Sequence, residues 1–327
     1  MARALFFLAS TAAILFVVGL HVGVRFTSPD VVLAALFDEA QDASGLIVQN
    51  LRLPRGILAL FVGASLGLSG LLMQCLMRNQ IAEPGLLGVN AGAAFAVVCL
   101  LSVYPASAIS SVIAAAAIGA AAATALVLTL SLATGGGLSP IFLLLAGVTI
   151  AALLNAGLQV LIILDEAVME ELLFWLAGAF VDRPIEGLWI VVVLVGLAVL
   201  LTWRFQPALD VMSTDDATAT TLGVDVAKMR LIFLGIAALL AGACVAFAGP
   251  IAFVGLVAPH LARLTGARGM AQLVPLSVLW GVNLALAADL LARFVLYPSE
   301  VPVSAVLAVI GVPTMLFLLK RRRLLAT

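Results

Sequence analysis

The chain has 327 residues, of which 64% are hydrophobic and only 10% are charged. Soluble domains carry about 25% charged residues, so this composition excludes a soluble globular protein and indicates an integral membrane protein. The formal net charge is −1, and we expect no nucleic-acid partner. Apolar segments recur over the whole length, so we expect a single transmembrane domain over residues 1–327 in a lipid bilayer.

A helix crosses the roughly 30 Å of bilayer hydrocarbon with about 20 residues. Apolar runs of this order predict an all-α fold with ten membrane spans. They are expected at residues 3–24, 56–77, 86–104, 108–132, 141–164, 187–203, 229–248, 250–265, 271–296 and 302–319. The three cysteines fall inside spans without a CxxC pattern or a metal-ligand spacing, and we expect no metal site.

An even number of spans places both termini on one side of the membrane. Of the 16 Lys and Arg residues, five lie on the opposite side, namely Arg25, Arg52, Arg55, Arg183 and Arg293, and eleven lie on the side of the termini. Basic residues are enriched in cytoplasmic loops. Both termini are therefore predicted to be cytoplasmic.

The sequence Arg52-Leu53-Pro54-Arg55 places two arginines at the outer mouth of the second span. They either anchor the helix by snorkelling or bind an acidic external partner or an anionic substrate. The residues alone leave both possibilities open.

Glycines follow at helical spacing, at Gly63, Gly67 and Gly70 and again at Gly88 and Gly92. Such spacing lets a second helix approach closely, so we expect close packing at both sets. The polar residues 79–84 are predicted to form a turn that caps two helices on the cytoplasmic side.

Residues 209–224 form the longest polar stretch on the cytoplasmic side. Ser213 or Thr214 can cap a short helix that has Asp215 and Asp216 in its first turn, and Gly223 can end it. A short amphipathic helix would give a cytoplasmic partner a place to bind, but composition favours it no more than a bare loop.

Residues 249–263 interrupt the apolar pattern with two glycines, two prolines, a histidine and an arginine. Irregular backbone at membrane depth is tolerated only where it packs inside protein or lines a cavity, and about 16 residues are short for a span. We therefore predict a broken helix against a transport path. Its distinctive residues are Gly249, Pro250, Gly255, Pro259, His260 and Arg263.

Asp289 and Arg293 are four residues apart in the ninth span and are predicted to pair on one helix face, with Arg293 near the outer surface. Asp289 is the only acid within any predicted span. Proton relays normally need several such groups, so a structural pair is the preferred interpretation.

Further short motifs follow in chain order: Leu144-Leu145-Ala146-Gly147-Val148, Trp175-Leu176-Ala177-Gly178, Leu222-Gly223, Glu300-Val301-Pro302-Val303 and Gly311-Val312-Pro313. Together with the segments above, they resemble the permease family of ABC importers for iron-siderophores, haem and cobalamin, the type II importers. The residues 138–140 and 85–93 are most similar to permeases for ferric catecholate siderophores.

The resemblance implies a type II importer permease fold and an iron-siderophore cargo, with haem or cobalamin as the alternative. It implies a second permease subunit, in a homodimer or a closely related heterodimer, with the path between the two subunits. It also implies an extracytoplasmic substrate-binding protein and two ATPase subunits in the inner membrane complex. ATP and Mg²⁺ would bind to the ATPase, and no cofactor to this chain.

The resemblance also implies roles for single residues. Arg52, Arg55 and Arg293 match arginines that dock the binding protein. The loop at about 208–227 matches the ATPase-coupling segment, and the residues assigned to it are Ser213, Asp215, Asp216, Leu222 and Gly223. The cytoplasmic gate corresponds to Ser139, Pro140 and Ile141. His260 and Arg263 are expected to be structural or coupling residues rather than catalytic ones.

Three positions depart from the family pattern. Gln80 stands where a proline is usual, and Asp215 and Ser304 stand where glycines are usual. Gln80 removes a rigid turn and Asp215 adds charge to the coupling loop, so both bear on how the ATPase fits.

Two other classes of membrane protein are alternatives, a secondary transporter and an intramembrane serine protease. The chain has no phosphate-binding Gly-x-x-x-x-Gly-Lys loop, so energy must come from a partner, and a secondary transporter would need protonatable or ion-binding groups in the membrane. An intramembrane serine protease would need a nucleophile next to a base, for which Ser69 and His260 are the candidates. Neither pattern is specific, and an ATP-driven importer permease, which is not an enzyme, is the preferred reading.

Overall fold

The computed structural model describes residues 1–23, 26–37, 42–105, 107–164, 169, 172–173, 175–178, 180, 187–296 and 299–325, with side chains up to residue 316. Arg25, Arg183 and the side chains of residues 320–323, which enter the charge count above, lie outside this description.

Helices make up nearly all of the described chain. The first half contains α1 (Ala2–His21), α2 (Pro29–Leu36), α3 (Ala43–Ile47), the π-helix η1 (Val48–Arg52), α4 (Leu53–Leu76), the 3₁₀ helix η2 (Pro84–Leu87), α5 (Val89–Val103), α6 (Ile109–Ala133) and α7 (Pro140–Leu164). The second half contains α9 (Leu188–Arg204), α10 (Gln206–Met212), α11 (Asp216–Thr221), α12 (Val226–Ala248), α13 (Val254–Leu264), α14 (Met270–Ala292) and α15 (Val303–Leu325).

Each predicted span coincides with a helix, and the all-α membrane fold is confirmed. Six described helices are long and apolar enough to cross a membrane, and a seventh results if α9 and α10, bent by 72°, count as one span. The helices α5 and α13 are shorter because the chain breaks just before each of them, so these two predicted spans began too early.

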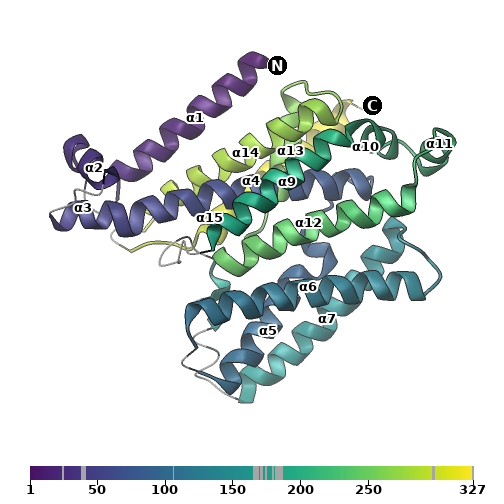
Figure 1. The fold of residues 1–327 in the computed structure, drawn as a ribbon, viewed down its shortest axis with the longest axis horizontal. Coiled ribbons are helices and arrows are strands. Elements are labelled where there is room, and N and C mark those ends of the chain that lie inside the picture. Colours follow the sequence, from purple (N-terminus) through teal and green to yellow (C-terminus); the bar gives the residue numbers. More distant parts are fainter. Residues whose placement is uncertain are drawn as a thin grey trace.

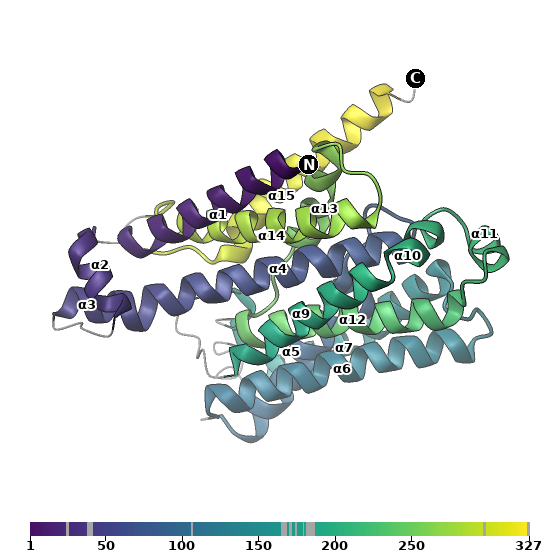
Figure 2. The same ribbon diagram turned by 45° about the horizontal axis from the view of Figure 1, so that its top comes forward.

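The long helix α4 lies in the middle of the molecule (Figure 1). It packs against α14 on one side and α12 on the other, and α12 in turn contacts α6. Figure 2 shows the same order, with α1 and α15 beyond α14. Both termini lie toward the end that carries α10 and α11, and α2 and α3 lie at the opposite end.

Glycines allow α4 to touch its neighbours through the backbone. A Cβ atom built on Gly63 would lie 2.5 Å from the carbonyl oxygen of Gly281 in α14, and one on Gly70 would overlap the carbonyl of Gly255 in α13. Gly92 meets Gly119 in the same way between α5 and α6. The close approach predicted from the glycine spacing is confirmed for the α4 glycines and for Gly92. It is not found at Gly88, where a Cβ atom would meet only side-chain atoms, the nearest at 3.6 Å.

The two halves of the bundle repeat one order of helix lengths. The helices α4 to α7 have 24, 15, 25 and 25 residues, and α12 to α15 have 23, 11, 23 and 23. In each half a long helix is followed by a proline-containing break and a short helix. Internal repeats with broken helices are typical of membrane transporters.

Candidate transport site

A cluster of charged side chains lies at the end of the bundle that carries α2 and α3. Arg55 donates from Nε to Asp289 Oδ1 at 2.5 Å and from Nη1 to Glu300 Oε2 at 2.6 Å. Arg293 Nη2 lies 2.5 Å from Asp289 Oδ2. The predicted pairing of Asp289 with Arg293 is confirmed, but sequence reasoning did not predict that Arg55 shares the same carboxylate.

The arginines of this cluster also bind the carboxyl end of α1, where helix carbonyl groups have no partner within the helix. Arg293 Nη1 donates to the carbonyl oxygens of Gly19 and Val22 at 2.7 and 2.8 Å. Arg52 Nη1 donates to those of Leu20 and His21, both at 2.9 Å. The cluster therefore connects α1, α4 and α14.

These contacts bury the three arginines. Arg293 is only 3% exposed, Arg55 is 6% exposed and Arg52 is 9% exposed. Arg293 follows the last residue of α14, and its side chain turns inward to Asp289 and the end of α1. Glu300 is the most accessible member, with 35% of its side chain exposed.

The two helix breaks of the repeat meet inside the bundle. Gly88 and Phe253, which precede α5 and α13, both have left-handed backbone, with φ of 74° and 68°. A small cavity of about 20 Å³ lies between the breaks. The residues around it are Leu66, Glu83, Pro84, Gly85, Asn90, Ala241, Val245, Ile251, Ala252, Phe253 and Gly255.

This cavity corrects one expectation and leaves another unchanged. Asp289 is still the only acid within a predicted span, because Glu83 precedes the span that was expected from residue 86. Leu66 and Ala241 come from the interiors of α4 and α12, so the chain from Glu83 onward returns to the depth of these helix interiors instead of staying in a turn at the helix ends. Hydropathy alone could not show this, since the break is short and the flanking helices are apolar.

The segment 249–263 includes most of α13, and its residues hydrogen-bond to α4. Arg263 Nη1 donates to Gln74 Oε1 at 2.7 Å, and Gln74 Nε2 donates to the carbonyl oxygen of Leu256 at 3.2 Å. Gly255 lies against Gly70, and Pro259 lies within α13. Before α13, the loop at Gly249 and Pro250 packs on the Trp175–Gly178 segment.

His260 and Ser69 hydrogen-bond to different carbonyl groups. The Nδ1 atom of His260 lies 3.0 Å from the carbonyl oxygen of Leu256, one turn back in α13. The hydroxyl of Ser69 donates to the carbonyl oxygen of Ala237 at 2.6 Å. A serine nucleophile must hydrogen-bond to a base. The Ser69 hydroxyl instead donates to a backbone carbonyl, which cannot act as that base.

The polar stretch 209–224, which was expected on the cytoplasmic side, contains the short helix α11. Its cap is Asp215, whose Oδ1 accepts from the backbone N–H of Thr218 at 2.8 Å. The hydrogen bonds from Thr218 hold the pKa of Asp215 below its usual value. Ser213 and Thr214, the predicted caps, instead donate to carbonyl oxygens of α10, so that prediction was wrong.

The far end of α11 follows the prediction. Gly223 has φ of 83° and ends the helix, as a glycine beyond a helix end commonly does. Leu222 is 65% exposed beside it.

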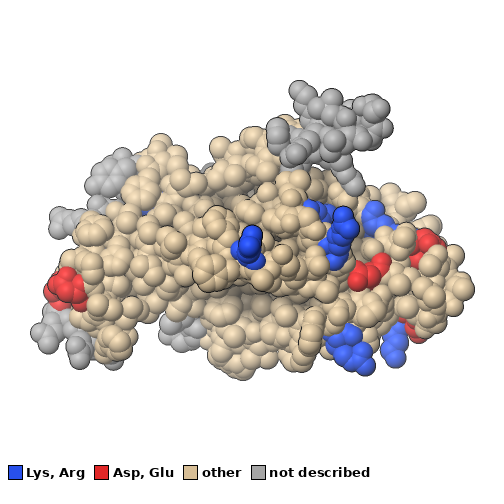
Figure 3. All heavy atoms as spheres, turned by 90° about the horizontal axis from the view of Figure 1, so that it is seen from above, with Lys and Arg blue, Asp and Glu red and all other residues tan. Residues whose placement is uncertain are grey.

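Charged side chains mark this end of the molecule. Figure 3 shows the blue and red side chains gathered mainly on the right, the end that carries α10 and α11, while most of the rest of the visible face is uncharged. Arg78 and Arg230 pair there with Asp216 of α11. Sequence reasoning used both arginines only as counted charges.

Two of the three departures from the family pattern have structural roles. Asp215 caps α11 as described, and the hydroxyl of Ser304 donates to the carbonyl oxygen of Ala177. Gln80 lies in the turn after α4, and nothing in the structure explains its presence there.

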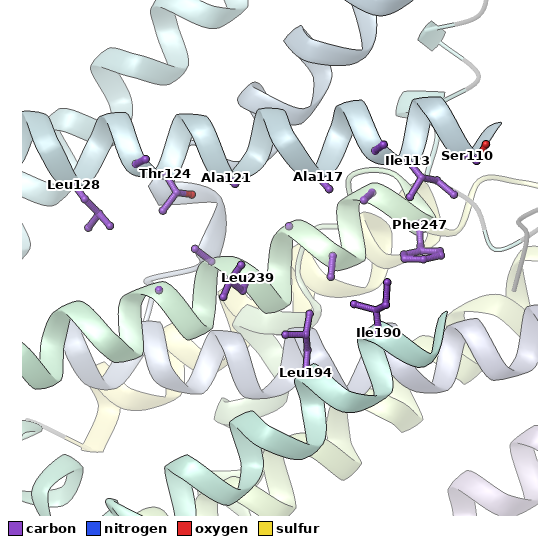
Figure 4. Close-up of a pocket in the computed structure, with 17 residues that line it drawn as sticks. Ser110, Ile113, Ala117, Ala121, Thr124, Leu128, Ile190, Leu194, Leu239 and Phe247 are labelled. Carbon is purple, nitrogen blue, oxygen red and sulfur yellow. The ribbon is translucent and has the colours of Figure 1, made fainter. Parts of the chain in front are cut away.

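An apolar groove of about 540 Å³ opens between α6, α9 and α12. Figure 4 shows Ile113, Leu128, Ile190, Leu194, Leu239 and Phe247 around it, with Ser110 and Thr124 as polar side chains. It lies within one subunit, whereas the expected path lies between two. None of its lining side chains is charged.

The chain is similar to known permeases over almost its whole length. It is 37% identical to the Fe(3+)-citrate import system permease protein YfmD of Bacillus subtilis, covering 98% of this chain and 96% of the relative. It is 40% identical to the ferric enterobactin transport system permease protein FepD of Escherichia coli, covering 93% and 90%.

A solved structure has the same fold. A metal-chelate type ABC transporter in an inward-facing conformation matches with a TM-score of 0.86 and 28% identity, over 98% of this chain and 100% of that chain. The model of the FecCD transport family matches residues 11–321. These matches span the charge cluster, both helix breaks and α11, and the chain belongs to the FecCD transport family.

Proposed function

We propose that this chain is the membrane-spanning permease subunit of an ATP-driven importer that brings a ferric siderophore across the bacterial cytoplasmic membrane. The observation that carries the proposal is the match over at least nine-tenths of both chains to permeases named for ferric citrate and ferric enterobactin. The matched region includes the two converging helix breaks, which suit a transporter.

The full transporter would contain a second permease subunit, identical or closely related, and two ATPase subunits that bind ATP and Mg²⁺. The exposed apolar surfaces of α7 and α15 support a shared interface: Leu145 and Val148 are 59% and 57% exposed, and Val309 is 73% exposed. The helix α11 would fit the ATPase. The termini, which lie toward α11, would then be cytoplasmic.

An extracytoplasmic binding protein would dock at the charge cluster. Three arginines and two acids leave one positive charge in excess among its five members, Arg52, Arg55, Asp289, Arg293 and Glu300. Because the arginines are buried, an acidic partner would reach Arg55 by taking the place of Glu300, the exposed member.

Replacing Glu300 by Gln tests this docking mode. The variant removes the carboxylate that competes for Arg55 Nη1, and we expect the binding protein to bind on the order of tenfold more tightly. The replacement Asp30→Asn removes an acid of α2 outside the cluster and should change the dissociation constant little. Equal tightening in both variants would indicate bulk charge only, and weaker binding in Glu300→Gln would overturn the docking mode.

The cargo is tested by uptake in a strain that lacks the chromosomal copy of this gene. Labelled ferric siderophores, haem and cobalamin are supplied separately to cells with and without the chain. We expect uptake of a ferric siderophore to depend on the chain. Dependence of haem or cobalamin uptake alone would assign the alternative cargo of the same family.

A secondary transporter is the competing class that a structural feature favours, because Glu83 lies beside the interiors of α4 and α12 and could carry a proton there. Asp289 cannot serve it as a free carboxylate, since two buried arginines neutralise it. One acid without a chain of protonatable neighbours is a weak basis for proton coupling.

A further inference from the structure

Asp216, the first residue of α11, is held by arginines from two other elements. Arg230 of α12 approaches it with both terminal nitrogens, at 2.8 Å from Nη2 to Oδ1 and 3.3 Å from Nη1 to Oδ2. Arg78, after α4, makes a single contact of 3.3 Å from Nη2 to Oδ2. A two-pronged guanidinium–carboxylate contact fixes orientation as well as distance.

The same Arg230 reaches the segment that precedes α7. Its Nη1 also donates to the carbonyl oxygen of Leu138 at 3.3 Å, two residues before Pro140, where α7 begins. Ser131 of α6 donates to the neighbouring carbonyl of Gly137 at 2.6 Å. One side chain thus contacts both α11 and the entry to the helix whose start carries Ser139, Pro140 and Ile141.

Burial restrains the side chain of Arg230, which connects α11 to the segment before α7. Arg230 is 5% exposed, whereas the side chain of Arg78 is 29% exposed. A buried guanidinium needs its carboxylate, because an uncompensated buried charge is costly. The Nε atom of Arg230 makes no hydrogen bond among the described residues. The side chain is therefore held through its two terminal nitrogens.

We propose that Arg230 is the residue that couples α11 to the start of α7. The proposal rests on the proposed function, since it assumes that a partner ATPase moves α11. When α11 moves, Asp216 carries the guanidinium of Arg230 with it, and the retained hydrogen bond to the Leu138 carbonyl draws that carbonyl along. The start of α7 then changes position together with α11. Arg230 acts as a positioning residue and touches no cargo.

The planar fork of the guanidinium is essential to this role. A lysine keeps the positive charge, but its three N–H donors sit on one nitrogen at the end of a flexible stem. It therefore cannot hold the two oxygens of Asp216 with two nitrogens in a fixed plane while it bonds the Leu138 carbonyl. Arg230→Lys should therefore preserve the ion pair and lose the coupling. Arg78→Lys is the matched control, because Arg78 pairs with the same carboxylate but contacts it once and nearer the surface.

The experiment uses the assembled transporter, permease with its ATPase and binding protein, in proteoliposomes. ATP hydrolysis and cargo uptake are measured together. We expect uptake per ATP hydrolysed to fall on the order of tenfold in Arg230→Lys, with hydrolysis retained, and to stay within about twofold of wild type in Arg78→Lys. An unchanged ratio in Arg230→Lys would overturn the proposal. Absence of uptake by the wild-type transporter would instead contradict the proposed function.

A charge swap separates coupling from simple pairing. The double variant Arg230→Asp with Asp216→Arg restores an ion pair, but aspartate cannot donate to the Leu138 carbonyl. Complex assembly, checked by size-exclusion chromatography, should recover relative to Arg230→Asp alone, while uptake per ATP stays low. Full recovery of uptake would show that only the ion pair matters and would contradict the proposal.

Hydrogen exchange gives a readout independent of transport. In the wild-type complex, binding of the ATPase and of nucleotide should change exchange both in α11 and in residues 138–142. In Arg230→Lys the change in α11 should persist and the change in residues 138–142 should be lost. Parallel changes in both segments of the variant would contradict the link.

Discussion

Asp289→Asn is expected to lower the free energy of unfolding by about 3–5 kcal/mol, because it takes from the buried Arg293 the carboxylate with which it pairs and leaves Arg55 with Glu300 alone. Asp289 is 2% exposed and pairs at 2.5 Å with both Arg55 and Arg293. The same arginines bind the end of α1, so the loss should also loosen α1 from the bundle. Chemical or thermal unfolding of the purified protein in detergent measures the effect.

Glu300→Gln is the control for this prediction. Among the described residues, the Glu300 carboxylate bonds only Arg55, and 35% of its side chain is exposed. An accessible pair contributes about 0–1 kcal/mol, so the control should be only slightly less stable than wild type. Similar small losses in both variants would show that the cluster is hydrated and that Asp289 does not hold it together.

Gly70→Ala is expected to reduce stability by about 1–3 kcal/mol, as overpacking in a close-packed interior does. A methyl group on Gly70 would overlap the carbonyl group of Gly255, and backbone atoms cannot move aside as a flexible side chain can. The variant should force α4 away from α13. Because this contact holds α13 next to its break, transport should fall as well.

Gly196→Ala is the matched control for Gly70→Ala. Gly196 lies in α9, and a Cβ atom built on it would have no neighbour within 4 Å. Alanine is about 0.8–1.0 kcal/mol more favourable than glycine inside a helix, so this variant should be neutral or slightly more stable. Equal behaviour of the two alanine variants in thermal unfolding would contradict the close approach of α4 and α13.

Local patterns in the sequence predicted much of the structure. Long apolar runs placed the helices, and the four-residue spacing of Asp289 and Arg293 predicted their ion pair. The glycines of α4 predicted a close helix contact. Each of these features depends on residues within a few turns of one helix, where spacing determines which side chains share a face.

Other features depend on contacts that no local pattern encodes. Arg55 is 234 residues from Asp289 and 245 from Glu300. The return of Glu83 to membrane depth depends on how two breaks, far apart in the chain, pack against each other. The cap of α11 was misplaced by one or two residues because Ser213, Thr214 and Asp215 are all good caps, and the end of α10 uses the first two.

The central claim is that the chain imports cargo with energy from a partner ATPase. Its most direct test is uptake of a labelled ferric siderophore into proteoliposomes that contain the permease, its ATPase and its binding protein. Uptake should require ATP and the binding protein, and it should stop when the ATPase carries a substitution that blocks hydrolysis. Uptake driven by a proton or sodium gradient without ATP would contradict the claim.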